Sequence, residues 1–187
     1  ILLLTLACIV SCGSNRRANA FLSHIDTLYQ QNPAEAIIAI DSFMSCHNDM
    51  SQHNRMLLTL YRLRAQNSVG EPFASDSLAR KVVEYFDDNG SVEEQMSAYY
   101  VLGSVYRDLD NYPEALTDYQ KAVALADTTD GNKNNAFLNR VYGQMGDVLL
   151  SQLAFNEAGI AYSLAVRFAR RSGRGPGRNV HRRPPGR

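Results

Sequence analysis

The sequence of 187 residues predicts an all-α fold in which helix hairpins stack as an α-solenoid. Three observations support this prediction. No segment alternates with the period of a β-strand, apolar stretches are interrupted at helix-length intervals, and one spacing of apolar and small residues recurs 43 residues later. Four hairpins are expected, near residues 20–46, 52–88, 92–127 and 136–170. Since about three repeats bury a continuous core, we expect one domain over residues 20–170.

The first hairpin is predicted from a helix-start signal between two apolar stretches. Phe21 and Ile25 begin one helical face. Asn32 and Glu35, three residues apart, form a capping box, and Pro33 occupies a first-turn position that tolerates proline. A second helix is therefore expected to begin at this point and to end near residue 46.

The second hairpin is predicted to consist of helices beginning near Ser51 and Ser75. Gly70 lies in the long link between them. Ser91 and Glu94 form another capping box, which predicts the start of the third hairpin.

The third and fourth hairpins share one register. Small and aromatic residues fall where two antiparallel helices pack most closely, and Gly103 permits a near approach. In the third hairpin these positions are Tyr99, Leu102, Gly103, Tyr106, Ala115, Tyr119 and Ala122. Six residues repeat the pattern 43 residues later: Tyr142, Gly146, Val148, Ala158, Tyr162 and Ala165.

The spacing of Tyr99, Leu102, Gly103 and Tyr106, followed by Ala115 and Tyr119, resembles the tetratricopeptide repeat. The resemblance implies a non-enzymatic scaffold that holds a peptide or protein partner in a concave groove. Carried over by position, the implied groove residues are Ser97, Tyr100, Ser104, Arg107 and Asp108 in one repeat, and Arg140, Gly143, Asp147 and Ser151 in the next. An alternative for Tyr100 is that its ring packs on the adjacent hairpin. Tyr100 beside Arg107 is the kind of aromatic and guanidinium pair that forms a binding hot spot.

The first 12 residues form an apolar run that is too short to span a bilayer and is typical of an export signal. Residues 9–12 resemble the bacterial lipobox, which implies cleavage before Cys12 and attachment of a diacylglycerol to it. Cys8 fits less well because Thr5 stands where an aliphatic residue is expected. Residues 13–19 are predicted to be a polar tether. We therefore expect an exported membrane lipoprotein facing the periplasm, resembling bacterial tetratricopeptide repeat lipoproteins; the alternative is a buried first helix.

Charge is distributed unevenly along the chain. Eight of the 19 basic residues are arginines from Arg167 onward, and no acidic residue follows Glu157. The rest of the chain therefore has 11 basic against 19 acidic residues, which disfavours nucleic-acid binding. Residues 171–187 are rich in Arg, Gly and Pro and are predicted to be disordered. They are interpreted either as a basic arm or, in preference, as sequence that is not genuinely coding.

Catalytic chemistry is not expected. His24, His47 and His53 have no metal-ligand spacing, and no phosphate-binding glycine loop or nucleophile motif occurs. Cys46 is predicted to be a passive packing residue. No cofactor or metal is predicted. The leading hypothesis is an interaction scaffold; the alternatives are the sensor part of a longer membrane regulator and a periplasmic enzyme with a further catalytic domain.

Overall fold

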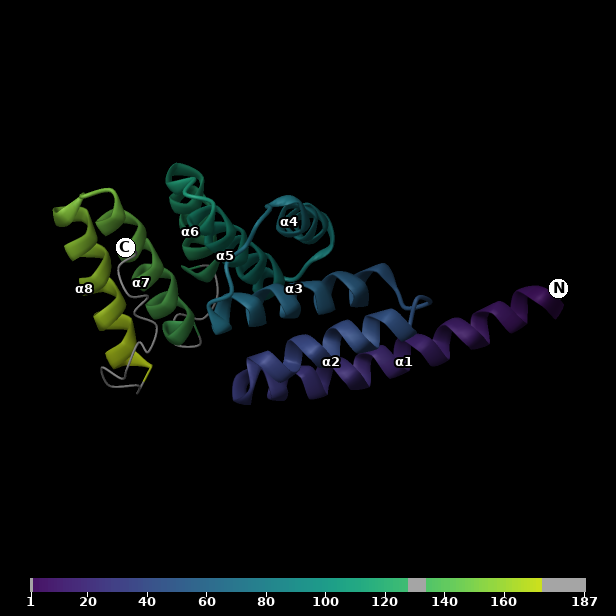
Figure 1. Ribbon diagram of the computed structural model, residues 1–187. Coiled ribbons are helices and arrows are strands. Elements are labelled where there is room, and N and C mark those ends of the chain that lie inside the picture. The colour runs from purple at the N-terminus through teal and green to yellow at the C-terminus, as the bar shows by residue number, and fades with distance from the viewer. Residues whose placement is uncertain (1, 128–133, 173–187) are drawn as a thin grey trace. The chain divides into compact units, whose positions relative to one another are not determined.

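The computed structural model describes the backbone of residues 2–127 and 134–172, and the side chains of residues 15–126 and 134–172. The described residues form eight α-helices and no strand, and adjacent helices pack in pairs (Figure 1). The all-α prediction is thus confirmed. The helices are α1 (Leu2–Gln31), α2 (Pro33–Cys46), α3 (Gln52–Val69), α4 (Ser77–Asn89), α5 (Val92–Asp108), α6 (Tyr112–Asp127), α7 (Asn135–Ser151) and α8 (Phe155–Arg171).

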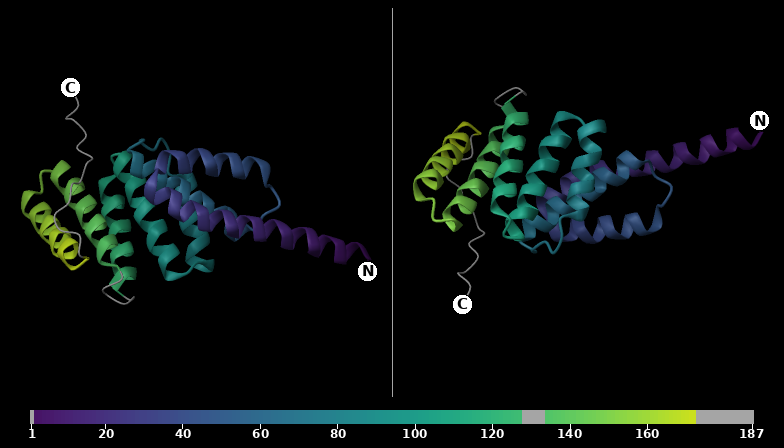
Figure 2. Two further views of the ribbon diagram at one scale, coloured as in Figure 1. Left: turned by 90° about the horizontal axis from the view of Figure 1, so that it is seen from below. Right: turned by 90° about the horizontal axis from the view of Figure 1, so that it is seen from above.

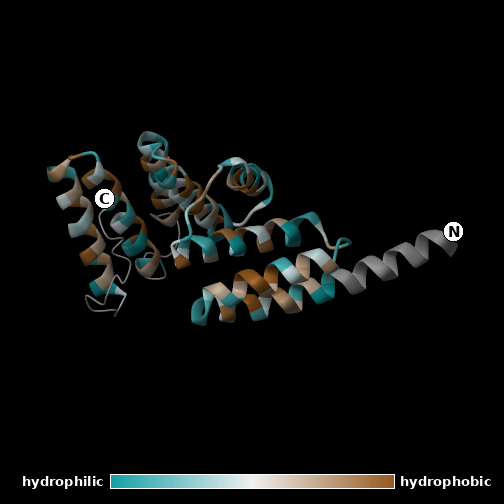
Figure 3. Cartoon of the chain, in the orientation of Figure 1, coloured by the Kyte–Doolittle hydropathy of each residue, from teal (hydrophilic) through white to brown (hydrophobic). Residues whose placement is uncertain are grey.

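The chain divides into two compact units. The first comprises Ile1–Pro72 with Ser77–Asn89, and the second comprises Phe73–Asp76 with Gly90–Arg187. The part of the α3–α4 link that belongs to the second unit, Phe73–Asp76, contains the buried Phe73, whose N–H donates to Asp108 Oδ2 at 3.2 Å. The helices of each unit carry both hydrophobic and hydrophilic residues (Figure 3).

Helix α1 is continuous through residues 13–19, where the sequence predicts a tether. Polar side chains of this segment are bonded to α3 and its cap. Asn15 Oδ1 accepts from the Ser51 N–H at 2.8 Å, and Asn19 Oδ1 accepts from Asn54 Nδ2 at 2.9 Å. Ala18 is fully buried between these contacts. Residues 15–19 are therefore part of the folded unit.

The core of the first unit lies between α1, α2 and α3. Ile25, Ile40 and Leu58 share one buried cluster, and none of the three is exposed. Helix α3 packs more closely on α2 than on α4, although α3 and α4 were predicted to form a hairpin. Helix α4 is nonetheless held against α3 by Phe86, whose ring lies 5.9 Å from that of His53.

Capping residues set the starts of several helices. At α5, the Ser91 side chain accepts from the Glu94 N–H while Glu94 Oε2 accepts from the Ser91 N–H, so the predicted capping box is complete. At α2, the Asn32 side chain accepts from the Glu35 N–H. The Glu35 carboxylate instead bonds the Asn32 side-chain amide, because the Asn32 N–H already donates to Leu28 O.

The second unit contains two hairpins, α5 with α6 and α7 with α8, which Figure 2 shows from two sides. In both, the first helix carries a glycine that faces a tyrosine ring of the second helix, as detailed below. Each turn also contains one non-glycine residue with positive φ, Asp110 at 57° and Leu153 at 60°. These residues are 43 positions apart, so the repeat extends to the conformation of the turn.

Candidate functional site

The repeat-defining residues form the interfaces within the two hairpins of the second unit. Nine of them are buried: Leu102, Gly103, Ala115, Tyr119, Ala122, Gly146, Val148, Ala158 and Ala165. Four aromatic ones are half-buried: Tyr99, Tyr106, Tyr142 and Tyr162. The closest approach is at Gly103, where a Cβ would lie 2.7 Å from Tyr119 Cδ1, and at Gly146, where it would lie 2.6 Å from Tyr162 Cε1.

Both tyrosine hydroxyls bond the residue that follows the glycine. Tyr119 donates to Ser104 Oγ at 3.2 Å, and Ser104 in turn donates to the carbonyl oxygen of Tyr100 at 3.0 Å. Ser104 is fully buried, so the prediction that it lines an exposed groove is corrected: Ser104 lies inside the hairpin. Burial raises the pKa of Tyr119 above its ordinary value.

In the second hairpin, Tyr162 donates to Asp147 Oδ1 at 2.7 Å. Burial, together with this hydrogen bond, raises the pKa of the Tyr162 hydroxyl. Asp147 is exposed, as a surface role requires, and one of its carboxylate oxygens already has a donor.

Tyr100 packs between helices, which is the alternative that the sequence left open. Its side chain is 6% exposed, and its ring centroid lies 5.9 Å from that of Tyr119 and 5.6 Å from that of Phe137. The guanidinium of Arg140, on α7, lies 6.0 Å from the centroid of the Tyr100 ring. The Tyr100 ring therefore packs near the guanidinium of the surface residue Arg140 and is not itself exposed to a partner.

Arg107 and Asp108 form an ion pair at the end of α5. Arg107 donates to Asp108 Oδ1 through Nη2 at 2.9 Å; the Arg107 side chain is 23% exposed and the Asp108 side chain 2%. Burial acts to lower the pKa of Arg107, but the neighbouring Tyr119 and Asp108 outweigh it and raise that pKa. Asp108 is thus a buried counter-ion and offers almost no surface to a partner.

Arg107 also donates to the side-chain oxygen of Gln144 on α7. Gln144 was not among the predicted residues. It lies one helical turn after Arg140, so the i,i+4 spacing along α7 was the signal that could have identified it. The remaining predicted positions differ in exposure: Ser97 is half-buried, Gly143 is buried, and Ser151 is exposed with its hydroxyl bonded to the Asp147 carbonyl.

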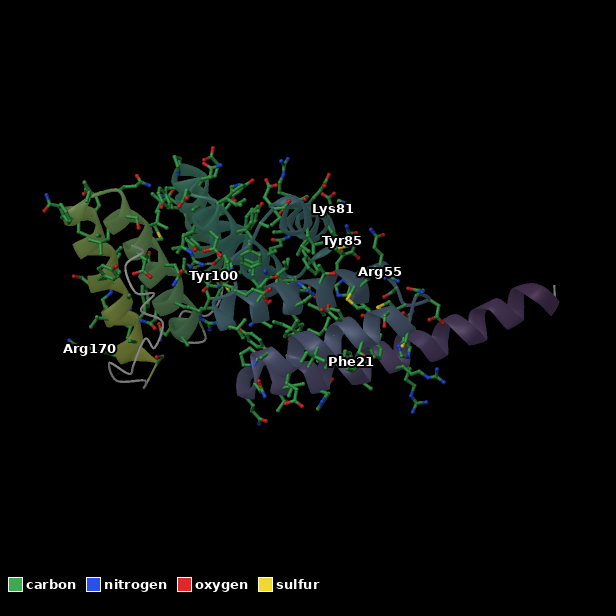
Figure 4. The ribbon with its side chains drawn as sticks, in the orientation of Figure 1. Phe21, Arg55, Lys81, Tyr85, Tyr100 and Arg170 are labelled. Atoms are coloured by element: carbon green, nitrogen blue, oxygen red, sulfur yellow. The ribbon has the colours of Figure 1, made fainter. Side chains whose placement is uncertain are left out.

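Tyr100, Arg107, Arg140 and Gln144 together form what we call the α5–α7 seam (Figure 4 labels Tyr100). The seam joins the first helices of two consecutive hairpins. It presents guanidinium and amide donors next to an aromatic support, a combination typical of protein-binding hot spots. Within the residues whose side chains are described, no group of three His, Cys, Asp or Glu is arranged to hold a metal ion.

The predicted lipidation site and most of the predicted C-terminal tail lie outside the part of the chain whose side chains the structure describes. The side chain of Cys12 lies outside the described residues, and so do residues 173–187. Among the helices that are described, none combines the length and apolarity needed to cross a bilayer.

Residues 97–128 match the family model of the tetratricopeptide repeat. The match covers most of α5 and all of α6, the hairpin that supplies Tyr100 and Arg107 to the seam. No curated protein and no solved structure matches the chain. The repeat and the helical hairpin fold support a protein–protein interaction scaffold, and tetratricopeptide repeats are generally non-catalytic.

Proposed function

We propose that this protein is an interaction scaffold that binds a peptide segment of a partner protein along the α5–α7 seam. The observation that carries the proposal is the alignment of Arg140 with Gln144 on α7, beside Arg107 of α5. Consecutive first helices of a tetratricopeptide array are the helices that face a bound peptide in this family. The chain has the same two helices adjacent, with polar side chains between them.

The chemistry of the seam favours a partner that supplies hydrogen-bond acceptors. Arg140 is exposed and its guanidinium is steadied by the Tyr100 ring. Gln144 is half-buried and its oxygen is bonded to Arg107, which leaves its amide hydrogens as donors. Backbone carbonyls or a carboxylate of an extended peptide would match these groups.

Photo-crosslinking tests the seam directly. A photo-reactive amino acid is placed at position 147, which is exposed on the same face of α7, and at position 80 of α4 as a control. We expect a crosslinked partner at position 147 that disappears when Arg140 is changed to Glu. Equal crosslinking from positions 147 and 80, or crosslinking that the Arg140→Glu variant retains, would refute the seam as the binding surface.

We further propose that the scaffold is exported and anchored to a membrane through a diacylglycerol on Cys12. The support is the lipobox-like segment at residues 9–12. Cleavage before Cys12 would fall within α1 (Leu2–Gln31), and the hydrogen bond from the Ser51 N–H to Asn15 Oδ1 lies beyond that point. Each buried methylene of the lipid contributes about 0.8 kcal/mol, and two chains give stable attachment.

The anchor is tested by fractionating cells that express the gene with its natural start. Cys12→Ala is expected to release the protein into the soluble periplasmic fraction, whereas Cys8→Ala leaves it with the membranes. Retention of the Cys12→Ala protein, with release of the Cys8→Ala protein, would assign the lipid to the other cysteine.

A further inference from the structure

Equivalent positions of α6 and α8 differ in burial. Five residues of α8 lie at spacings of 4, 3, 4 and 3 and therefore share one helical face. We call this face the α8 stripe: Phe155, Gly159, Tyr162, Val166 and Ala169. The residues 43 positions earlier on α6 are Tyr112, Leu116, Tyr119, Val123 and Ala126.

Every member of the α6 set is more buried than its counterpart on α8. Tyr119 and Ala126 are fully buried, while Tyr162 and Ala169 are half-buried. Tyr112 and Val123 are half-buried, and the corresponding Phe155 and Val166 are 64% and 43% exposed. Leu116 is half-buried and its counterpart, Gly159, is exposed. Among the described residues, the same face is thus covered on α6 and more exposed on α8.

Helix α7 is what covers the α6 face, and it does so antiparallel to α6. Val123 and Ala126 share a core cluster with Leu138 near the start of α7, and Asn134 Nδ2 donates to the Ala126 carbonyl at 3.2 Å. At the other end, Ser151, the last residue of α7, lies close enough to the Tyr112 hydroxyl at the start of α6 to act on its pKa. The start of α7 therefore lies over the end of α6.

From this comparison we infer that the α8 stripe is a docking surface for an amphipathic helix of a partner protein, which lies on α8 as α7 lies on α6. Because the two hairpins of the second unit repeat at 43 residues, the residues of α8 that would contact the partner helix correspond one by one to the residues of α6 that contact α7. Gly159 has open space where its Cβ would be, so a helix can approach the middle of the stripe closely. This surface is on a different helix from the α5–α7 seam and is inferred independently of it.

The charges around the stripe define the chemistry of the partner. Arg170, which follows Ala169 of the stripe, is exposed and projects from the last turn of α8 (Figure 4), whereas Arg167 and Arg171 are exposed further round the helix in its last two turns. The acidic residue of α8, Glu157, is in its first turn. A helix antiparallel to α8 would place its first turn near the arginines. The partner helix is therefore apolar on one face and acidic in its first turn, which also suits its own helix dipole.

The same charges disfavour a symmetric pair of copies joined through α8 in parallel, because the arginine ends would meet. The favoured arrangement is therefore the one in which the acidic first turn of a partner helix meets the arginines at the end of α8. The chain itself contains a helix of this kind. Helix α5 is the first helix of a hairpin, is largely apolar after its first turn, and has Glu93 and Glu94 in that turn.

A stapled helical peptide with the sequence of residues 91–108 is therefore a suitable probe, titrated against the full-length protein by fluorescence anisotropy. We expect saturable binding that Val166→Glu weakens at least about tenfold, because a carboxylate would be buried against an apolar face. Leu78→Glu, at a residue of α4 with 44% exposure against 43% for Val166, is the matched control and leaves binding unchanged. Gly159→Gln is a second variant that fills open space, cannot disturb the core, and also weakens binding.

The predicted attraction between Arg170 and the acidic first turn of the peptide is tested by reversing the charge on each side. Arg170→Glu weakens binding of the peptide several-fold, and a peptide with Glu93→Lys and Glu94→Lys restores it. Arg140→Glu, in the α5–α7 seam, leaves peptide binding unchanged, so failure of the seam and failure of the α8 stripe are distinguishable. Absence of saturable binding, or equal binding by wild type and Val166→Glu, overturns the inference.

Two further outcomes would assign the α8 stripe to another occupant. Sedimentation equilibrium that shows a wild-type dimer and a Val166→Glu monomer would identify a second copy of the chain. Binding to phosphatidylglycerol vesicles that Val166→Glu abolishes, in the absence of peptide binding, would identify a lipid surface. Either result overturns the assignment to a partner helix.

Discussion

The ring of Tyr119 lies against Gly103 so closely that a Cβ on the glycine would come within 2.7 Å of Tyr119 Cδ1 and 3.1 Å of the Ala115 carbonyl oxygen. Tyr119 is fully buried and cannot move aside, and the carbonyl belongs to the backbone of α6. The pair at Gly146 and Tyr162 has the same geometry, but the Tyr162 ring is half-buried. The two hairpins therefore differ in how well they tolerate a side chain at the contact.

We predict that Gly103→Ala destabilises the second unit by about 1–2 kcal/mol, because the overpacking penalty exceeds the gain in helix propensity. Gly146→Ala is expected to lower stability by less than about 1 kcal/mol, since the Tyr162 ring can shift outward. Urea unfolding followed by circular dichroism measures both. Gly159→Ala, at a position with open space, should stabilise by about 0.5–1 kcal/mol. A Gly103→Ala protein as stable as wild type would show that the contact is not as tight as described.

Leu153 is expected to be a source of strain. It has φ of 60° and is 71% exposed, whereas the residue in the same place of the preceding hairpin is Asp110, a better left-handed residue. Leu153→Asn should raise stability by about 0.5–1 kcal/mol, because little buried apolar area is lost. The reciprocal change, Asp110→Leu, should lower it and also removes the acceptor of the Tyr112 hydroxyl. Thermal unfolding of the two variants in opposite directions is the expected result, and shifts of the same sign would argue against strain at the turn.

Arg107 is predicted to be important for stability as well as for binding. Arg107→Met leaves the Asp108 carboxylate, 2% exposed, without its counter-ion and should destabilise the protein by about 2–3 kcal/mol. The double variant with Asp108→Asn should recover part of this loss, because the buried charge is then removed. Unfolding free energies of the wild type, both single variants and the double variant form a complete cycle. An Arg107→Met protein with wild-type stability would mean that the carboxylate is solvated in solution.

Stability is predicted to fall in alkaline solution through Tyr61. Burial, and then the hydrogen bond from its hydroxyl to Asp26 at 2.9 Å, raises the pKa of Tyr61 to about 12. The ordinary value is 10.0, so between these two pH values the unfolded chain loses the proton before the folded protein does. The contribution is complete below pH 10 and is lost as the pH approaches 12. Unfolding free energy measured across this range should decline less steeply in Tyr61→Phe than in wild type, and identical slopes would contradict the prediction.

Periodicity and capping signals were sufficient to predict the helices. Ser91 and Glu94 form the expected capping box, and Gly103 and Gly146 lie at the closest helix contacts. These features are local or repeat at a fixed distance, so a single sequence displays them. The start of α1 could not be predicted in this way: residues 13–19 look like a solvated tether, and only Asn15 and Asn19 bonding to distant partners makes them part of the fold.

The candidate site was harder to predict, because exposure depends on how hairpins stack. Helical spacing placed Ser104 on the same side of α5 as Arg107, but the Tyr119 hydroxyl lies over Ser104 and buries it. Gln144 of α7 belongs to the site because it contacts Arg107 of α5, which is in the preceding hairpin. Sequence spacing gives the direction of a side chain around its own helix, whereas the neighbour that covers it is a property of the assembled unit.

The two glycine–tyrosine contacts have equal spacing within their hairpins, from position 103 to 119 and from 146 to 162. An in-frame deletion of residues 104–146 would join Gly103 directly to Asp147, keep every remaining residue in its helical phase, and bring the ring of Tyr162 onto Gly103. The chain would lose one hairpin without needing a new turn or a new core residue. The contact between a glycine of the first helix and a tyrosine of the second would therefore be kept when the unit changes by 43 residues.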